Sequence, residues 1–281
     1  MLVFKRLMVF VAANMAVLAG GPAWAQDAPT GQPHPWQLGL QQAATPVMDN
    51  IVWFHNFLLW LIVAITLFVL VLLMVVIVRF NARSNPVPSR TTHNTLIEVA
   101  WTVVPVLILV SIAVPSFRLL FLELYLPKAD ITIKATGKQW FWSYSYPDEK
   151  FEFDSLLVQE KDLKQGQPRL LTADNAMVVP VNKVVRVQTT GADVIHSWAV
   201  PSFGVKIDAI PGRLNETWFK AEHTGTYYGQ CSELCGRDHA FMPIEVRVVS
   251  DQEYTAWIAD AKKKFASDDN RSTAVASAET R

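Results

Sequence analysis

The segment Gly229–Pro243 reads Gly-Gln-Cys-Ser-Glu-Leu-Cys-Gly-Arg-Asp-His-Ala-Phe-Met-Pro and contains both cysteines of the 281-residue chain. Within it, Cys231, Cys235, His239 and Met242 follow one another at spacings of four, four and three residues. Two thiols, an imidazole and a thioether are soft donors, which favour copper over magnesium or calcium. The segment therefore predicts a copper site.

Two other interpretations of this segment are open. The same spacings would place the four side chains on one face of a helix, and the two thiols could form a disulfide in an oxidising compartment. The glycines and the proline of the segment favour a loop between two strands instead. A disulfide would also leave His239 and Met242 without a role.

The composition places part of the chain in a membrane. Hydrophobic residues make up 51% of the sequence and charged residues 18%, below the roughly 25% charged share of soluble domains. Lys plus Arg and Asp plus Glu are 25 each, so the chain lacks the positive excess that neutralises phosphates, and no nucleic-acid partner is expected. The length leaves room for one globular domain beside membrane-embedded sequence.

The first 25 residues are typical of a secretory signal peptide. Lys5 and Arg6 precede an apolar run from Leu7 to Leu18, and Ala23-Trp24-Ala25 forms a small-x-small cleavage site. We expect residues 1–25 to be removed and residues 26–50 to form a periplasmic leader. An uncleaved anchor helix is the alternative, although the apolar run is short for a membrane span.

Two uncharged runs, Phe57 to Val78 and Val99 to Phe117, predict a transmembrane hairpin over residues 51–118. The two prolines of the second run are tolerated where neighbouring helices satisfy the freed backbone groups. The connecting loop, residues 79–98, carries three arginines, whereas residues 26–50 carry no Lys or Arg. By the positive-inside rule the loop is cytoplasmic, and the C-terminal domain is outside the membrane.

Residues 119–265 are predicted to form a strand-rich domain, so the expected class is mainly β after an α-hairpin. Polar and apolar residues alternate over 131–134, 181–188 and 244–248. Ser250 with Glu253 forms a capping-box signature before an apolar helical stripe, which predicts a terminal helix packed on the sheet. The Ser-, Ala- and Asp-rich residues 266–281 predict a disordered tail.

A centre with two thiolates needs imidazoles besides His239. His34 lies in the Pro-rich leader, His55 at the mouth of the first span and His93 in the cytoplasmic loop, so these three are poorly placed. His223 lies at a turn. His196, which follows a predicted strand, is the remaining candidate.

Three sequence motifs together carry a resemblance to a known family. They are the segment Gly229–Pro243, the run Val-Ile-His-Ser-Trp-Ala-Val-Pro at 194–201, and Gln-Trp-Phe-Trp-Ser-Tyr at 139–144. With the signal peptide and the membrane hairpin, the chain resembles subunit II of bacterial haem-copper (aa3-type) cytochrome c oxidases over nearly its whole mature length. The resemblance implies a cupredoxin-like β-barrel outside the membrane with a dinuclear copper centre, CuA.

The resemblance also implies a function for the chain. It would accept electrons from cytochrome c and pass them to haem a in subunit I of a proton-pumping oxidase in the bacterial inner membrane. Oxygen would be reduced at haem a3 and CuB of subunit I, because nothing in this chain resembles a haem or CuB site. The absence of a Cys-x-x-Cys-His segment argues against a haem attached to this chain.

Carried over to this sequence, the resemblance implies a set of copper ligands. Thiolates of Cys231 and Cys235 would bridge both coppers, and the remaining ligands would be His196, His239, Met242 and the backbone carbonyl of Glu233. The side chain of Glu233 would help to hold a Mg²⁺ or Mn²⁺ shared with subunit I, for which a carboxylate is a suitable hard ligand. On the sequence alone, a surface residue is the favoured interpretation of Glu233.

Roles outside the copper ligands also follow from the resemblance. Trp140 would be the point at which electrons enter, and Glu98 would lie at the mouth of a proton-uptake pathway. Acidic residues could face the basic haem edge of cytochrome c: Asp148, Glu149, Glu152, Asp154 and Asp193. Ser145 stands where many relatives carry an acid, which points to a weaker or shifted docking patch.

These residues also have interpretations that involve no function. The aromatic run suits strand packing or an interfacial belt, Glu98 suits a carboxylate at the membrane surface, and the acids suit a solvated surface. A periplasmic copper chaperone for oxidase assembly is the alternative function, because that class also uses Cys-x3-Cys with a distant His. Such chaperones have a thioredoxin-like fold and one membrane anchor, whereas this chain predicts two spans and a strand-rich domain.

Overall fold

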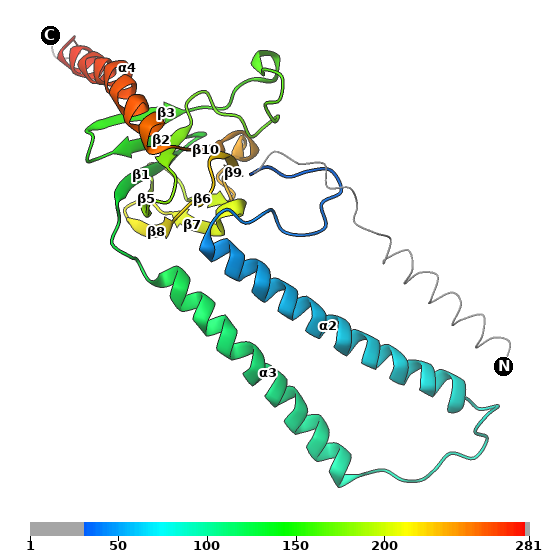
Figure 1. The fold of residues 1–281 in the computed structure, drawn as a ribbon. Coiled ribbons are helices and arrows are strands. Elements are labelled where there is room, and N and C mark those ends of the chain that lie inside the picture. The colour runs from blue at the N-terminus through cyan, green and yellow to red at the C-terminus, as the bar shows by residue number, and fades with distance from the viewer. Residues whose placement is uncertain (1–30, 279–281) are drawn as a thin grey trace.

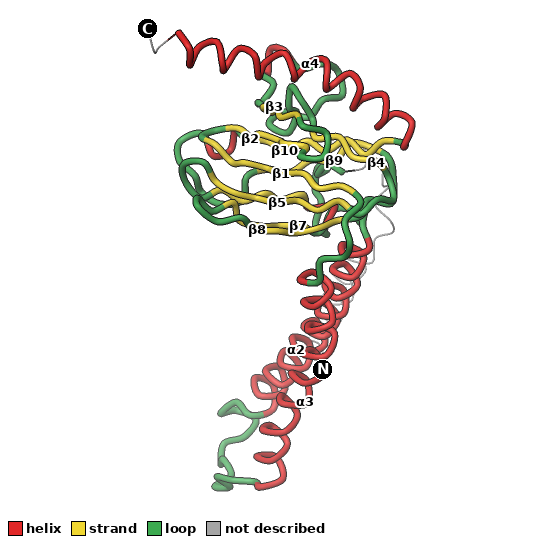
Figure 2. Tube along the Cα trace, turned by 90° about the vertical axis from the view of Figure 1, so that its left-hand side faces the viewer, coloured by secondary structure: helices red, strands yellow, loops and turns green. Residues whose placement is uncertain are grey.

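The structure, a computed structural model, describes residues 31–278 and their side chains as far as residue 265. The predicted signal peptide, residues 1–25, lies outside the described residues. Figure 1 shows two long helices joined to a strand-rich domain, with a further helix at the C-terminal end. Figure 2 places the helical pair on one side of the strands and the terminal helix on the other.

The helical pair consists of α2, Pro46–Arg79, and α3, Thr95–Leu124. Both helices are long and apolar enough to cross a membrane, in agreement with the predicted hairpin. Each extends beyond its uncharged run because a capping side chain, Thr45 for α2 and Asn94 for α3, accepts a backbone hydrogen bond from the first turn. The two prolines of α3 lie inside the helix without ending it.

The described part of the predicted leader, from residue 31 onward, packs on the β domain. Thr45 Oγ1 donates a 2.7 Å hydrogen bond to the Phe203 carbonyl, and the Tyr228 backbone N–H donates to the Gly31 carbonyl at 2.9 Å. A Cβ added to Gly31 would lie 2.6 Å from the Tyr227 side chain, so only glycine fits there. The leader therefore fixes the start of α2 against the β domain.

Ten strands are described after the hairpin: β1 Ile131–Lys138, β2 Phe141–Tyr146, β3 Phe151–Ser155, β4 Met177–Pro180, β5 Val185–Gly191, β6 His196–Val200, β7 Val205–Ala209, β8 Asn215–Phe219, β9 Gly225–Gln230 and β10 Pro243–Val249. Short 3₁₀ helices lie between some of them: η1 Glu160–Asp162, η2 Pro201–Phe203 and η3 His239–Phe241. The strand predicted from Val181 begins only at Val185, because Asn182 has a left-handed φ of 60°.

The strands form three hydrogen-bonded sheets in the orders β3-β2-β1-β5-β8, β4-β10-β9 and β6-β7. The β1–β5 and β4–β10 pairs are parallel. Burial alternates along β1 and β5, as expected for half-buried strands. Figure 2 shows the strands stacked across the domain, so the predicted β domain between the hairpin and a terminal helix is confirmed.

Large buried side chains join β6 to the five-stranded sheet. Trp142, Tyr144 and Trp198 are fully buried, and Trp198 Nε1 donates a 3.3 Å hydrogen bond to the Tyr144 hydroxyl. Burial raises the pKa of Tyr144, so its hydroxyl keeps its proton. Because His196 is the first residue of β6, these contacts also fix the position of that histidine.

The terminal helix α4, Asp251–Ala278, begins with the predicted capping box. Ser250 Oγ accepts from the Glu253 N–H at 3.3 Å, and the Glu253 carboxylate accepts from the Ser250 N–H at 2.9 Å. Trp257 of α4 makes T-shaped contacts with Phe151 and Phe153 of β3, and Phe265 stacks on Phe153. The helix is described as far as Ala278, and the disordered tail expected over residues 266–281 stays a prediction. Neither Gly nor Pro occurs in α4 to end it earlier.

Candidate metal centre

Two segments that are distant in the sequence supply the predicted ligands. Cys231 directly follows β9 and Met242 directly precedes β10, and these strands pair antiparallel with Gln230 opposite Pro243. The segment between them is therefore a loop joining two strands, which excludes the helical alternative. His196 is the first residue of β6, and Ser197 follows it. The Ser197 carbonyl accepts a 3.0 Å hydrogen bond from the Ser232 N–H, which joins β6 to the ligand loop.

The side chains of the loop converge on one buried point. Cys231 Sγ lies 3.9 Å from Cys235 Sγ, 3.9 Å from His196 Nδ1 and 3.3 Å from the Glu233 carbonyl oxygen. Cys235 Sγ lies 3.5 Å from His239 Nδ1 and 3.5 Å from Met242 Sδ. All six predicted ligands are therefore brought together. Both cysteines are free, so the disulfide alternative does not apply to this structure.

A metal ion fits this donor set. The ligand atoms of His196, Cys231 and Cys235 all lie within 4.8 Å of one another, and these three side chains and Met242 are buried. Thiolate, thioether and imidazole donors in a site that excludes water suit copper. His239 is half-buried, so it forms the side of the site nearest to the surface.

The two thiols have different pKa values because their environments differ. Burial opposes ionisation of Cys231, but hydrogen bonds from His196 and from nearby backbone groups lower its pKa to about 7. Burial and the negative charge of Cys231 raise the pKa of Cys235 to about 12. Without a metal, Cys231 therefore loses its proton before Cys235 does, and a bound cation would displace the protons of both thiols.

His196 is held on three sides. Its Nδ1 faces Cys231, while its Nε2 donates to the Asp193 carboxylate at 2.8 Å. A carboxylate behind a ligating histidine sets its tautomer and orientation. The edge of Trp142 packs on the imidazole with centroids 6.0 Å apart, and a Cβ on Gly137 would lie 2.7 Å from the ring. Gly137 therefore makes room for the ligand.

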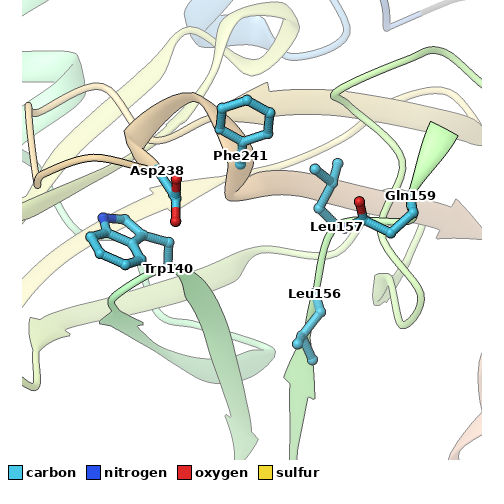
Figure 3. Close-up of a pocket in the computed structure, with 6 residues that line it drawn as sticks. All are labelled: Trp140, Leu156, Leu157, Gln159, Asp238 and Phe241. Atoms are coloured by element: carbon cyan, nitrogen blue, oxygen red, sulfur yellow. The ribbon is translucent and has the colours of Figure 1, made fainter.

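Trp140 lies against the ligand loop. Its Nε1 donates to the Cys235 carbonyl at 3.3 Å, and the Arg237 guanidinium lies 5.6 Å from its ring centroid. Figure 3 shows Trp140 and Asp238 on one side of a surface groove and Phe241, Leu157 and Gln159 across from them. The groove has a volume of about 330 Å³ and gives a partner access to the indole.

Comparison with known proteins assigns the chain to a family. Residues 131–249 match the family described as Cytochrome C oxidase subunit II, periplasmic domain, and residues 33–119 match the family described as its transmembrane domain. The chain belongs to the cytochrome c oxidase subunit II family. This confirms the resemblance found in the sequence.

Individual relatives agree with the assignment to the subunit II family. A probable cytochrome c oxidase subunit 2 of Rickettsia bellii is 50% identical over 263 residues, covering 93% of this chain and 98% of that protein. The cytochrome c oxidase subunit 2 of Cereibacter sphaeroides is 49% identical over 250 residues, covering 83% of this chain and 82% of that protein. A crystal structure of the periplasmic domain of subunit II of cytochrome oxidase from Bradyrhizobium japonicum is 72% identical, covers 50% of this chain and 99% of that chain, and has a TM-score of 0.48.

The acids predicted to dock a donor lie at the β2–β3 turn, on β3 and beside the metal site of this subunit II chain. Asp148 and Glu149 lie at the β2–β3 turn, about 20 Å along β2 from Trp140 at the usual strand rise, and Glu149 pairs with Lys262 of α4. Asp154 bonds to Ser143 and pairs with Lys138 at 3.6 Å. Glu152 is exposed on β3.

The Asp193 carboxylate is hydrogen-bonded to residues around the metal site. Its carboxylate accepts hydrogen bonds from His196 Nε2 and from the backbone N–H groups of Gln139 and Val194. Burial raises the pKa of Asp193, but these bonds outweigh burial and lower it overall. The acid next to Trp140 is Asp238, which sequence reasoning missed although it lies inside the ligand segment. It pairs with Arg237 at 2.9 Å.

Two further predicted site residues, Glu98 and Glu233, lie at the start of α3 and in the ligand loop. Glu98 Oε1 accepts the Asn94 backbone N–H at 3.1 Å, so it caps the start of α3. Glu233 has an exposed side chain, while its carbonyl faces Cys231. The side chain of Glu233 is therefore accessible to a second subunit.

Proposed function

We propose that this chain is the electron-accepting subunit of a proton-pumping cytochrome c oxidase, which takes electrons from cytochrome c and delivers them to haem in subunit I for the reduction of oxygen. The observation that carries the proposal is the convergence of two thiols, two imidazoles, a thioether and a carbonyl at one buried point. Membership of the subunit II family supports it.

The six converging residues would hold a dinuclear copper centre, which supplies reversible one-electron transfer when bound. The chain contributes a fixed geometry. The ligand loop is closed by β9–β10 pairing, and His196 is held by Asp193, Trp142 and the space left by Gly137. A site whose ligands are held by packing and hydrogen bonds changes little when the charge changes.

Trp140 connects the surface to this site. The indole borders the groove, and its N–H bonds to the carbonyl of Cys235, whose thiol is a ligand. Electrons from cytochrome c would enter here. Around the indole, Asp238 is paired with Arg237 and Asp193 with His196, so donor recognition close to Trp140 relies on contact with the groove, while Glu152 and Asp148 act at longer range.

Subunit I is the partner expected on the membrane side, with further oxidase subunits. The chain is placed in the bacterial inner membrane with its β domain in the periplasm, supported by the basic loop between α2 and α3. The exposed Glu233 carboxylate would complete a Mg²⁺ or Mn²⁺ site with residues of subunit I.

The proton-pathway role of Glu98 is tested by Glu98→Gln. Glutamine retains the oxygen that caps α3 but cannot exchange a proton at neutral pH, so we expect turnover and proton pumping to fall roughly tenfold or more. Glu98→Ala, which also removes the cap, is the comparison for helix stability. Unchanged turnover and pumping in Glu98→Gln would assign Glu98 a capping role only.

The experiment that tests the proposed function is copper analysis with electron paramagnetic resonance of the oxidase containing the full chain. We expect two coppers in this chain in addition to the CuB of subunit I, and a hyperfine pattern of one electron shared equally by two nuclei. His223→Ala, which alters an exposed histidine outside the cluster, is the control and should leave the pattern unchanged. A single spectroscopically silent copper beyond CuB, or a Cys231–Cys235 disulfide without metal in this chain, would instead favour the copper-chaperone alternative or a structural role.

A further inference from the structure

Gln139 joins β1 to β2 and makes two hydrogen bonds into the metal site. Its backbone N–H donates to Asp193 Oδ2 at 2.7 Å. Its side-chain Nε2 donates to the Cys235 carbonyl at 2.9 Å. One residue therefore contacts both segments that carry the ligands.

These two bonds close a ring of contacts around the site. Asp193 holds His196 Nε2, His196 Nδ1 faces Cys231, and Cys231 lies against Cys235. Gln139 completes the ring by bonding Asp193 on one side and Cys235 on the other. The amide of Gln139 is the shorter of two side-chain bonds that fasten the ligand loop to the β1–β2 connection.

The same carbonyl also receives the indole of Trp140. Trp140 Nε1 donates to the Cys235 carbonyl at 3.3 Å, beside the shorter bond from Gln139. The next residue, Gly236, has a φ of 125°, and a Cβ there would lie 3.0 Å from Trp140 Cζ2 and 3.1 Å from Gln139 Nε2. The amide and the indole therefore pack closely on one peptide group.

We propose that Gln139 is a positioning residue for electron transfer, whose side-chain amide holds the Cys235 peptide and thereby sets the placement of both the thiol ligand and the Trp140 indole. The proposal rests on the proposed function, because the placement matters only if electrons pass between Trp140 and the metal site. Gln139 acts through Cys235 and does not recognise the donor.

The test is Gln139→Met in the assembled oxidase. Methionine has a similar length but no donor, and the backbone bond to Asp193 remains. We expect an altered copper hyperfine pattern, a shifted midpoint potential, and electron transfer from cytochrome c about tenfold slower, with KM for cytochrome c within about twofold of wild type. Gln139→Glu places an acceptor opposite the carbonyl and should have a larger effect of the same kind. All values are taken per copper-containing enzyme, so reduced assembly does not obscure them.

Gln159→Met is the matched control, because Gln159 lines the groove beside Trp140 but has no bond to the ligand loop among the described contacts. It should leave the copper spectrum and potential unchanged. A wild-type spectrum, potential and rate in Gln139→Met would overturn the proposal, and so would a raised KM with an unchanged spectrum, which would make Gln139 a docking residue. Failure of the proposed function is recognised separately, because the wild-type enzyme would then lack the dinuclear spectrum.

Discussion

Replacement of Cys231 by serine is expected to abolish copper binding and electron uptake while the hairpin and the β domain still fold. Cys231 Sγ contacts His196, the Glu233 carbonyl and Cys235, so its loss removes three contacts of the site at once. A serine hydroxyl has nearly the same shape but is a hard donor that stays protonated at neutral pH, and it cannot replace a thiolate on copper. The loss should therefore be chemical and not structural.

Three measurements separate these effects. The copper bound by this chain and its hyperfine pattern should be lost, leaving the metals of subunit I, and turnover with cytochrome c should become undetectable. The amount of membrane-inserted chain should stay close to wild type. Ser232→Ala is the control: among the described contacts, the Ser232 hydroxyl that it removes bonds to the Gln230 carbonyl and to no ligand. Dinuclear copper and turnover retained in Cys231→Ser would remove Cys231 from the ligand set.

The membrane hairpin was predictable because uncharged runs of membrane length are a property of the local sequence. Its boundaries were less predictable. α2 and α3 continue beyond their apolar runs to the capping residues Thr45 and Asn94, and caps respond to hydrogen bonding and not to hydropathy. The packing of the leader on β9 could not be predicted, since it depends on contacts such as Gly31 with Tyr228, far apart in the sequence.

The metal site was likewise predictable where it depends on local sequence and not where it depends on tertiary contacts. Spacing within one loop indicated Cys231, Cys235, His239 and Met242, and the strand pairing that closes the loop brings them together. The sequence predicts Asp193 as a docking acid but does not indicate its hydrogen bond to the ligand His196.

The fold places the Asp193 carboxylate against the Gln139 N–H, 54 positions away in the chain, and against His196. The role of Gly137 could likewise not be predicted from the sequence, because this glycine acts through the space that it leaves for His196. Contacts of this kind depend on tertiary structure, and no local pattern reports them.

Replacement of Trp140 by alanine is expected to slow electron transfer from cytochrome c by about two orders of magnitude and to change cytochrome c binding much less. The indole is the one side chain of the described groove that also bonds to a ligand residue, through the Cys235 carbonyl. Removing it leaves a gap between the donor and the site, whereas Phe241 and Leu157 still offer the donor a contact surface.

Trp140→Phe separates the ring from its hydrogen bond. Phenylalanine fills most of the same volume beneath Arg237 but cannot donate to the Cys235 carbonyl, so an intermediate rate is expected if both the ring and the N–H carry the transfer. Rapid-mixing kinetics should be compared with the affinity of the reduced donor, and the copper spectrum of each variant should stay close to wild type because Gln139 still holds the carbonyl. If affinity fell as much as the rate, Trp140 would be a docking residue, and electrons would reach the copper by another route.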